Sequence, residues 1–121
     1  MTGRFRYAEK HKGGVMNVFT RTHRNVLYIS LDGELDEKTA EYTRLALEQT
    51  MLTARANQIV IDLAKLSFMD STGIGVLLGR YKKMKDRGIP IYIANPSVQA
   101  ERIFQMTGLY KIMPKIKGAM L

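Results

Sequence analysis

The chain has 121 residues, of which 45% are apolar, and its formal net charge is +8. A chain of this length can build one hydrophobic core without disulfides or metals as staples. The absence of cysteine excludes disulfides, thiol nucleophiles and thiolate metal sites.

Neither a leader peptide nor a membrane span is expected from the sequence. Residues 1–14 carry basic side chains but lack the apolar segment that secretion signals need. No apolar run reaches the roughly 18–20 residues that cross a bilayer. We therefore expect a cytoplasmic protein that makes no contact with a membrane.

The positive charge is spread along the chain. Residues 1–14 are predicted to be a flexible basic extension, and residues 15–121 to be the folded domain. Clustered basic residues can bind nucleic acid, but cations at the end of a helix are also favoured by its dipole. Such a group lies at the end of a predicted helix: Lys82, Lys83, Lys85 and Arg87. We expect solvated charges and no direct contact with nucleic acid.

Two strands are predicted at the start of the domain. Residues 15–22 and 25–31 are rich in β-branched and aromatic side chains, and the residues between them suit a hairpin turn. Asp32 and Gly33 are predicted to end the second strand.

An amphipathic helix is predicted next. Asp36 is a suitable N-cap residue for a helix that runs to about Arg55. Apolar or small residues recur there at three- or four-residue spacing, as one face of a helix requires. They are Ala40, Thr43, Leu47, Met51 and Ala54.

Residues 58–63 form a short, nearly continuous apolar run, which is typical of a central strand covered on both faces. A loop over residues 64–70 is predicted to lead into a second helix. That helix contains an apolar stripe and is ended by Gly88 and Pro90.

The last third of the chain predicts one more strand and one more helix. Residues 89–94 are a buried strand, and a third helix begins around residues 95–97 and ends at Gly108. Residues 109–113 add a short strand or a turn of helix. The alternation predicts an α/β fold with a single mixed β-sheet of four or five strands and three or four helices mainly on one face.

Three familiar kinds of chemical site fit the sequence poorly. Gly73, Gly75 and Gly79 suggest a dinucleotide loop, but nine residues separate them from the preceding strand, where that loop needs a tight turn. Ser71 lacks the nucleophile elbow of hydrolases and a base with an orienting partner. The two histidines have no second ligand at coordinating spacing. No catalytic residue, metal or cofactor is expected.

Asp70, Ser71 and Thr72 could each cap the second helix, yet one cap is sufficient. A helix N-terminus offers free N–H donors and partial positive charge, so a phosphate on Ser71 would leave the fold intact. A partner docked there would have to desolvate a dianion beside Asp70, which costs several kcal/mol. Ser71 is therefore a candidate modification site.

Gly75 and Gly79 are four residues apart and so lie on one face of the predicted helix. Two interpretations stay open for them. They leave backbone accessible for the close approach of a partner, or they allow the helix to pack tightly on its own sheet.

The run from Leu66 to Lys82, LSFMDSTGIGVLLGRYK, resembles the phosphorylation-site helix of anti-sigma factor antagonists, which are STAS-domain proteins of endospore-forming bacteria. The stretches GELD at 33–36 and IFQMTGL at 103–109 also resemble that family. The resemblance covers roughly residues 16–113 and is strongest to the sporulation group that acts on the anti-sigma F factor. Members usually end with a further helix, for which residues 114–121 leave little room.

The resemblance implies a binding module and not an enzyme. In the family, the unphosphorylated antagonist binds an anti-sigma factor that is also a serine kinase, and so frees a sigma factor. Phosphorylation releases the antagonist, and a serine phosphatase resets it. By motif match the phosphorylated residue is Ser71, with Thr72 as a second hydroxyl. The implied partner-binding residues are Asp36, Asp70, Ser71, Thr72, Gly73, Ile74 and Gly75.

Two other functions stay open at this point. The first is a STAS interaction or scaffold domain that phosphorylation does not regulate. The second is a nucleic-acid-binding domain that uses the basic helix end. Its expected mark, aromatic residues interleaved with Lys and Arg on a sheet face, is missing.

Overall fold

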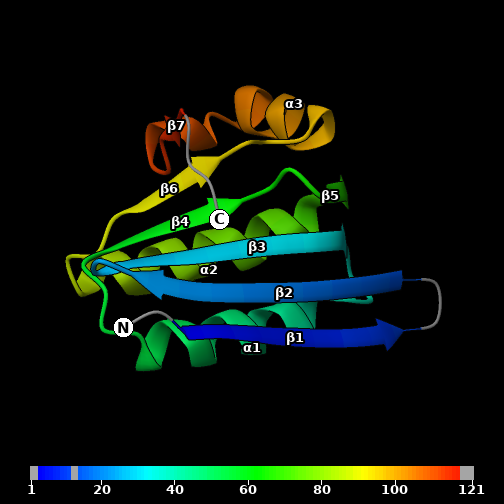
Figure 1. Ribbon diagram of the computed structural model, residues 1–121. Coiled ribbons are helices and arrows are strands. Elements are labelled where there is room, and N and C mark those ends of the chain that lie inside the picture. The colour runs from blue at the N-terminus through cyan, green and yellow to red at the C-terminus, as the bar shows by residue number, and fades with distance from the viewer. Residues whose placement is uncertain (1–2, 12–13, 118–121) are drawn as a thin grey trace.

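The computed structural model describes residues 3–11 and 14–117 (Figure 1). All of its strands join one mixed sheet in the order β1-β2-β3-β4-β6-β7, and β5 also pairs with β3. The strands are β1 (Gly3–His11), β2 (Gly14–His23), β3 (Val26–Leu35), β4 (Gln58–Asp62), β5 (Leu66–Met69), β6 (Ile91–Ala94) and β7 (Lys115–Ile116). The single mixed sheet is confirmed, and its seven strands exceed the four or five predicted.

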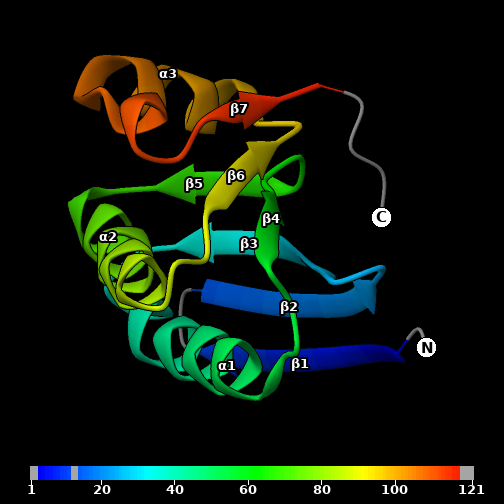
Figure 2. The same ribbon diagram turned by 90° about the vertical axis from the view of Figure 1, so that its left-hand side faces the viewer.

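Three α-helices and one 3-10 turn complete the described fold. The helices are α1 (Ala40–Thr53), α2 (Ser71–Asp86) and α3 (Val98–Thr107), and the 3-10 turn η1 is Leu109–Lys111. Helices α1 and α2 lie side by side on one face of the sheet, whereas α3 lies near β5, at the β6 and β7 side of the molecule (Figures 1 and 2). The prediction of helices mainly on one face is therefore confirmed.

The predicted hairpin is present, but its second strand is longer than expected. Arg24 and Asn25 form the turn with positive φ angles of 50° and 64°, as a tight two-residue hairpin requires.

The prediction that Gly33 ends the strand is wrong. Gly33 adopts a φ of 145° at a shift in register, and β3 continues to Leu35 by pairing with β5. A glycine here makes a bulge and does not end the strand.

The predicted flexible extension over residues 1–14 differs from the structure where it is described. Gly3–His11 form β1, which pairs antiparallel with β2 along its whole length. Residues 1–2 and 12–13 lie outside the described residues. The edge of β2 offers unpaired backbone groups, and a neighbouring strand satisfies them whatever its sequence. Net charge alone did not reveal this pairing.

Two segments have a different secondary structure from the predicted one. Residues 66–69 were predicted to lie in a loop but form β5, a short parallel partner for the end of β3. Residues 109–113 contain η1, the helical alternative, and the following β7 pairs with β6. Residues 118–121 lie outside the described part of the domain.

The hydrophobic core lies between the sheet and its helices. Alternate residues of β3 point toward α1 and α2 and are almost fully buried, as period-two alternation predicts: Leu27, Ile29 and Leu31. They pack in one cluster with apolar residues of the helices, among them Leu47, Leu77 and Phe104. Val60 in β4 is only 3% exposed although it points to the other face, so the prediction of a strand buried on both faces is confirmed.

Candidate functional site

The start of α2 is capped by one side chain only. Asp70, in extended conformation just before the helix, accepts hydrogen bonds at Oδ1 from the backbone nitrogens of Thr72 at 3.0 Å and Gly73 at 3.3 Å. Ser71 and Thr72 are both exposed. Within residues 3–11 and 14–117 no hydrogen bond engages either hydroxyl, so neither is needed as a cap.

The position of Ser71 is fixed by the strands beneath it. Met69, the last residue of β5, pairs with Leu35 at the end of β3, and the backbone nitrogen of Asp70 donates to the Leu35 carbonyl oxygen at 3.4 Å. The first turn of α2 therefore stands at the end of β3. This places it next to the chain that continues from Leu35 into Asp36.

Gly73 allows this close packing. A β-carbon at residue 73 would lie 2.7 Å from Met69 Cγ, 2.8 Å from Leu35 Cγ and 2.9 Å from the Leu35 carbonyl oxygen. A side chain at residue 73 would therefore force Leu35 or Met69 to shift. The residue was predicted to belong to the partner-binding set, and the structure places it in the buried base of the helix start.

Gly75 and Gly79 behave differently from Gly73. A β-carbon at either position would meet nothing within 4 Å. Tight packing of the helix on its own sheet therefore does not explain them. The interpretation that survives is an open backbone on the outer surface of α2, with Gly75 one turn beyond Ser71.

Asp36 has a different role from the predicted helix cap. Its Oδ1 accepts hydrogen bonds from the backbone nitrogens of Lys38 at 2.9 Å and Thr39 at 3.2 Å, in a turn that precedes α1. The fully buried Thr39 donates from its hydroxyl to the Glu34 carbonyl oxygen at 2.6 Å. The prediction that α1 begins at Asp36 is wrong, because this turn delays the helix to Ala40.

A shallow groove of about 350 Å³ lies between the start of α2 and α3. Asp70, Ser71 and Ile74 line it from one side. Helix α3 supplies the other side, including Ile103 and Met106, and Met106 is 79% exposed. The further lining residues are Met69, Gln99, Arg102 and Thr107.

The contribution of α3 to this groove was missed by reasoning from the sequence. The sequence places Met106 in the predicted third helix, and relates the IFQMTGL stretch only to the family resemblance. The sequence offered one indication that Met106 is exposed. It lies between the polar residues Gln105 and Thr107, and the buried stripe of the helix is complete without it. Only the packing of α3 beside β5 shows that it faces Ser71.

No other kind of reactive centre is seen in the described residues. Residues 3–11 and 14–117 contain no cluster of three metal-ligating side chains. His23 is exposed at the last position of β2, next to the hairpin turn. No helix in the same part of the chain is both long and apolar enough to cross a membrane.

The fold and the sequence match known proteins. The STAS domain family matches residues 17–119. The chain is 39% identical over 92 residues to the anti-sigma F factor antagonist of Paenibacillus polymyxa, covering 76% of this chain and 79% of that protein. It is 33% identical over 106 residues to the anti-sigma-B factor antagonist of Staphylococcus epidermidis, covering 85% and 94%.

The fold is also that of a solved relative, the anti-sigma factor antagonist SpoIIAA. Its unphosphorylated form superposes with a TM-score of 0.68 at 25% identity, over 95% of this chain and 89% of that one. The phosphorylated form, from Bacillus, gives a TM-score of 0.63 at 25% identity, over 95% and 92%. This chain therefore belongs to the STAS domain family and, within it, to the anti-sigma factor antagonists.

Proposed function

We propose that this protein binds an anti-sigma factor and is switched off by phosphorylation of Ser71. The anti-sigma factor is also the serine kinase, and a serine phosphatase removes the phosphate. Binding of the unphosphorylated form releases the sigma factor for transcription. The observation that carries this proposal is the exposed Ser71 hydroxyl at the first position of α2, where Asp70 already serves as the cap.

The names of the relatives suggest which partner to test first. Identity is higher to the anti-sigma F factor antagonist, at 39%, than to the anti-sigma-B factor antagonist, at 33%. We therefore propose an anti-sigma F factor as partner and a role in sporulation. Sigma factors act on transcription, so we propose that the protein works in the cytoplasm.

The fold would tolerate a phosphate on Ser71. The side chain already points to solvent, so phosphorylation displaces nothing. The phosphate adds about −1.5 to −2 charges at the positive end of α2. The helix dipole there contributes roughly 0.3–1 kcal/mol of attraction. Phosphorylation should thus change the surface and not the stability of the domain.

A docked partner would not tolerate the same phosphate. The dianion would lie beside the carboxylate of Asp70, and an interface that covers both would leave the added charge buried and unpaired. That penalty is several kcal/mol, and about 4–5 kcal/mol weakens binding roughly a thousandfold or more. This is sufficient for an on–off switch.

The groove between α2 and α3 gives the partner an apolar binding surface next to Ser71. We propose that the anti-sigma factor inserts an apolar side chain between Ile74 and Met106, while its kinase site faces Ser71. Gly75 leaves backbone open for that approach. Asp36 and Asp70 contribute the polar margin of the same surface.

The test is phosphorylation in vitro followed by intact mass measurement. The protein is incubated with ATP and, separately, with an anti-sigma F factor and an anti-sigma-B factor. We expect the mass of one phosphate on the wild type and on Thr72→Ala, and none on Ser71→Ala. Thr72→Ala is the matched control, because Thr72 is the adjacent exposed hydroxyl on the same helix turn.

Binding is then measured on the same proteins by titration calorimetry. Ser71→Ala should bind the anti-sigma factor as tightly as the unphosphorylated wild type, with or without ATP. If the wild type binds but never gains a phosphate, the protein is an interaction domain without this switch. If neither anti-sigma factor binds, the proposed partner class is wrong.

A further inference from the structure

The face of the sheet opposite α1 and α2 carries an ordered row of side chains. In register, Arg21 of β2 pairs with Tyr28 of β3, Tyr28 pairs with Val60 of β4, and Val60 pairs with Tyr92 of β6. Residues paired in this way point to the same face. Figure 1 looks onto this face, with α1 and α2 behind the strands.

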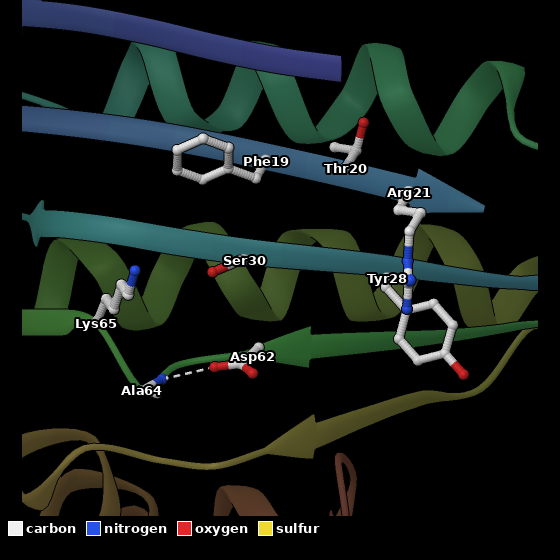
Figure 3. A pocket seen from close by; sticks show the side chains of 8 residues that line it. All are labelled: Phe19, Thr20, Arg21, Tyr28, Ser30, Asp62, Ala64 and Lys65. Carbon is white, nitrogen blue, oxygen red and sulfur yellow. Dashed lines mark hydrogen bonds between the residues drawn. The ribbon is translucent and has the colours of Figure 1, made fainter. Parts of the chain in front are cut away.

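A second row runs beside the first. Phe19 pairs with Ser30, and Ser30 pairs with Asp62. Between the rows lies a hollow of about 390 Å³, which the Lys65 side chain also borders (Figure 3). The guanidinium carbon of Arg21 is 5.1 Å from the centroid of the Tyr28 ring, so a cation and an aromatic ring are stacked in the hollow.

Two described cations, Arg21 of β2 and Lys65 after β4, line the hollow and bring positive charge to this face. Asp62 is an acidic residue on the same face, and it is only 9% exposed. Its carboxylate accepts hydrogen bonds from the Ala64 backbone nitrogen at 2.8 Å and from Asn95 Nδ2 at 2.9 Å.

A second acidic residue, Asp32 of β3, lies farther from Arg21. Asp32 pairs with Asn17, one row beyond Phe19 and two rows beyond Arg21. Its charge therefore adjoins the far end of the hollow. The chain as a whole carries a net charge of +8, which attracts polyanions.

We propose that this face binds single-stranded nucleic acid. Every base has an aromatic face that can stack on Tyr28, Phe19 or an arginine plane, and every nucleotide carries a phosphate that Arg21 and Lys65 can neutralise. A duplex hides its base faces inside the stack and cannot make these contacts. The surface lies on the opposite side of the sheet from α2, so this binding is independent of the proposed switch at Ser71.

Fluorescence anisotropy with a labelled twelve-nucleotide thymidine strand tests the proposal, and a uridine strand of equal length distinguishes DNA from RNA. We expect binding by the wild type that weakens with salt, with a log–log slope of about −0.7 for each phosphate contacted. Tyr28→Leu should weaken binding about tenfold, because stacking is lost while apolar volume is kept. Arg21→Ala should weaken binding and make the salt slope shallower by about 0.7.

Lys83→Ala is the matched control, because it removes one positive charge from an exposed position on α2. It should change the affinity less than twofold. Phe19→Leu, at the other ring that lines the hollow, provides a second aromatic variant should Tyr28→Leu melt at a lower temperature than the assay. The proposal is overturned if no strand binds at low salt, or if Lys83→Ala weakens binding as much as Arg21→Ala does. It is also overturned if a duplex or a mononucleotide competes as well as the strand.

Discussion

A β-carbon on Gly73 would lie 2.9 Å from the carbonyl oxygen of Leu35, so the first turn of α2 rests directly on the end of β3. We predict that Gly73→Ala lowers the free energy of unfolding by about 1–3 kcal/mol, because backbone must shift to accept the methyl group. Urea denaturation of the purified protein measures this. An unchanged midpoint would show that the two elements are not held so close.

Gly75→Ala is the matched variant on the same helix, and it should have the opposite effect on stability. Nothing lies within 4 Å of the added carbon, so the helix gains roughly 0.5–1 kcal/mol from better propensity. If the open backbone serves the anti-sigma factor, the same variant should bind that partner more weakly. Gly79→Ala, one turn farther from Ser71, should gain stability without losing affinity.

The capping hydrogen bonds of Asp70 and its negative charge can be tested separately. Asp70→Ala removes the hydrogen bonds to Thr72 and Gly73 and should cost about 1 kcal/mol of stability. Asp70→Asn keeps a good capping group and should cost only a few tenths of a kcal/mol. Thermal melting distinguishes the two. Equal losses for both variants would mean that the charge, and not the cap, stabilises the start of α2.

Ser71→Asp should fold as well as the wild type and yet bind the anti-sigma factor poorly. An acidic residue in the first turn of a helix is favoured by roughly 0.3–1 kcal/mol, so the melting temperature should stay the same or rise slightly. Circular dichroism melting and calorimetric binding are measured on one preparation. A largely unfolded Ser71→Asp would contradict the claim that charge acts at the interface alone.

Glu101 on α3 holds two segments that follow it in the chain. Its carboxylate accepts from Lys115 Nζ at 2.8 Å and from the Tyr110 hydroxyl, and the hydrogen bond from Lys115 is the main reason that the pKa of Glu101 is lowered. A lowered pKa means that this contribution to stability is present above the ordinary carboxyl pKa and is lost as the pH falls through the folded value. The contribution of this contact to stability is therefore lost in acid, below about pH 4.

Glu101→Gln tests this contact. The melting temperature of the variant should be lower than that of the wild type near neutral pH, and the difference should shrink in acid as wild-type Glu101 is protonated. Lys117→Gln serves as the charge control, because it changes a charge at an exposed position. Gln105→Glu would not serve, because it adds a charge beside Glu101. A difference that does not change with pH would argue that the carboxylate charge plays no part.

The regular elements could be predicted because their cause is local. Alternation in residues 25–31 and the apolar run at 58–63 each reflect burial that neighbouring residues share along one strand. The capping residues Asp70 and Ser97 lie where the sequence indicated a helix start. The start of α1 was misplaced, because Asp36 forms its capping bonds in a turn three residues earlier.

Elements that depend on a distant partner could not be predicted. Residues 66–69 are too short to be recognised as a strand and become one only by pairing with the end of β3. The groove beside Ser71 requires α3 to lie across from α2, and the row from Arg21 to Tyr92 is assembled from four strands. The prediction that aromatic and basic side chains do not interleave on a sheet face is wrong, because Arg21 and Tyr28 alternate across the strands and not along them.

The sequence by itself determined the alternation of strands and helices, the exposed hydroxyl at a capped helix start, and the family resemblance that the comparisons confirm. Periodicity and capping are carried by residues within a few positions of one another, so they can be read without coordinates. The tertiary structure alone decided which surfaces surround Ser71 and what lies on the opposite face. Those surfaces are made by residues far apart in the chain, and only the pairing register and the packing of helices bring them together.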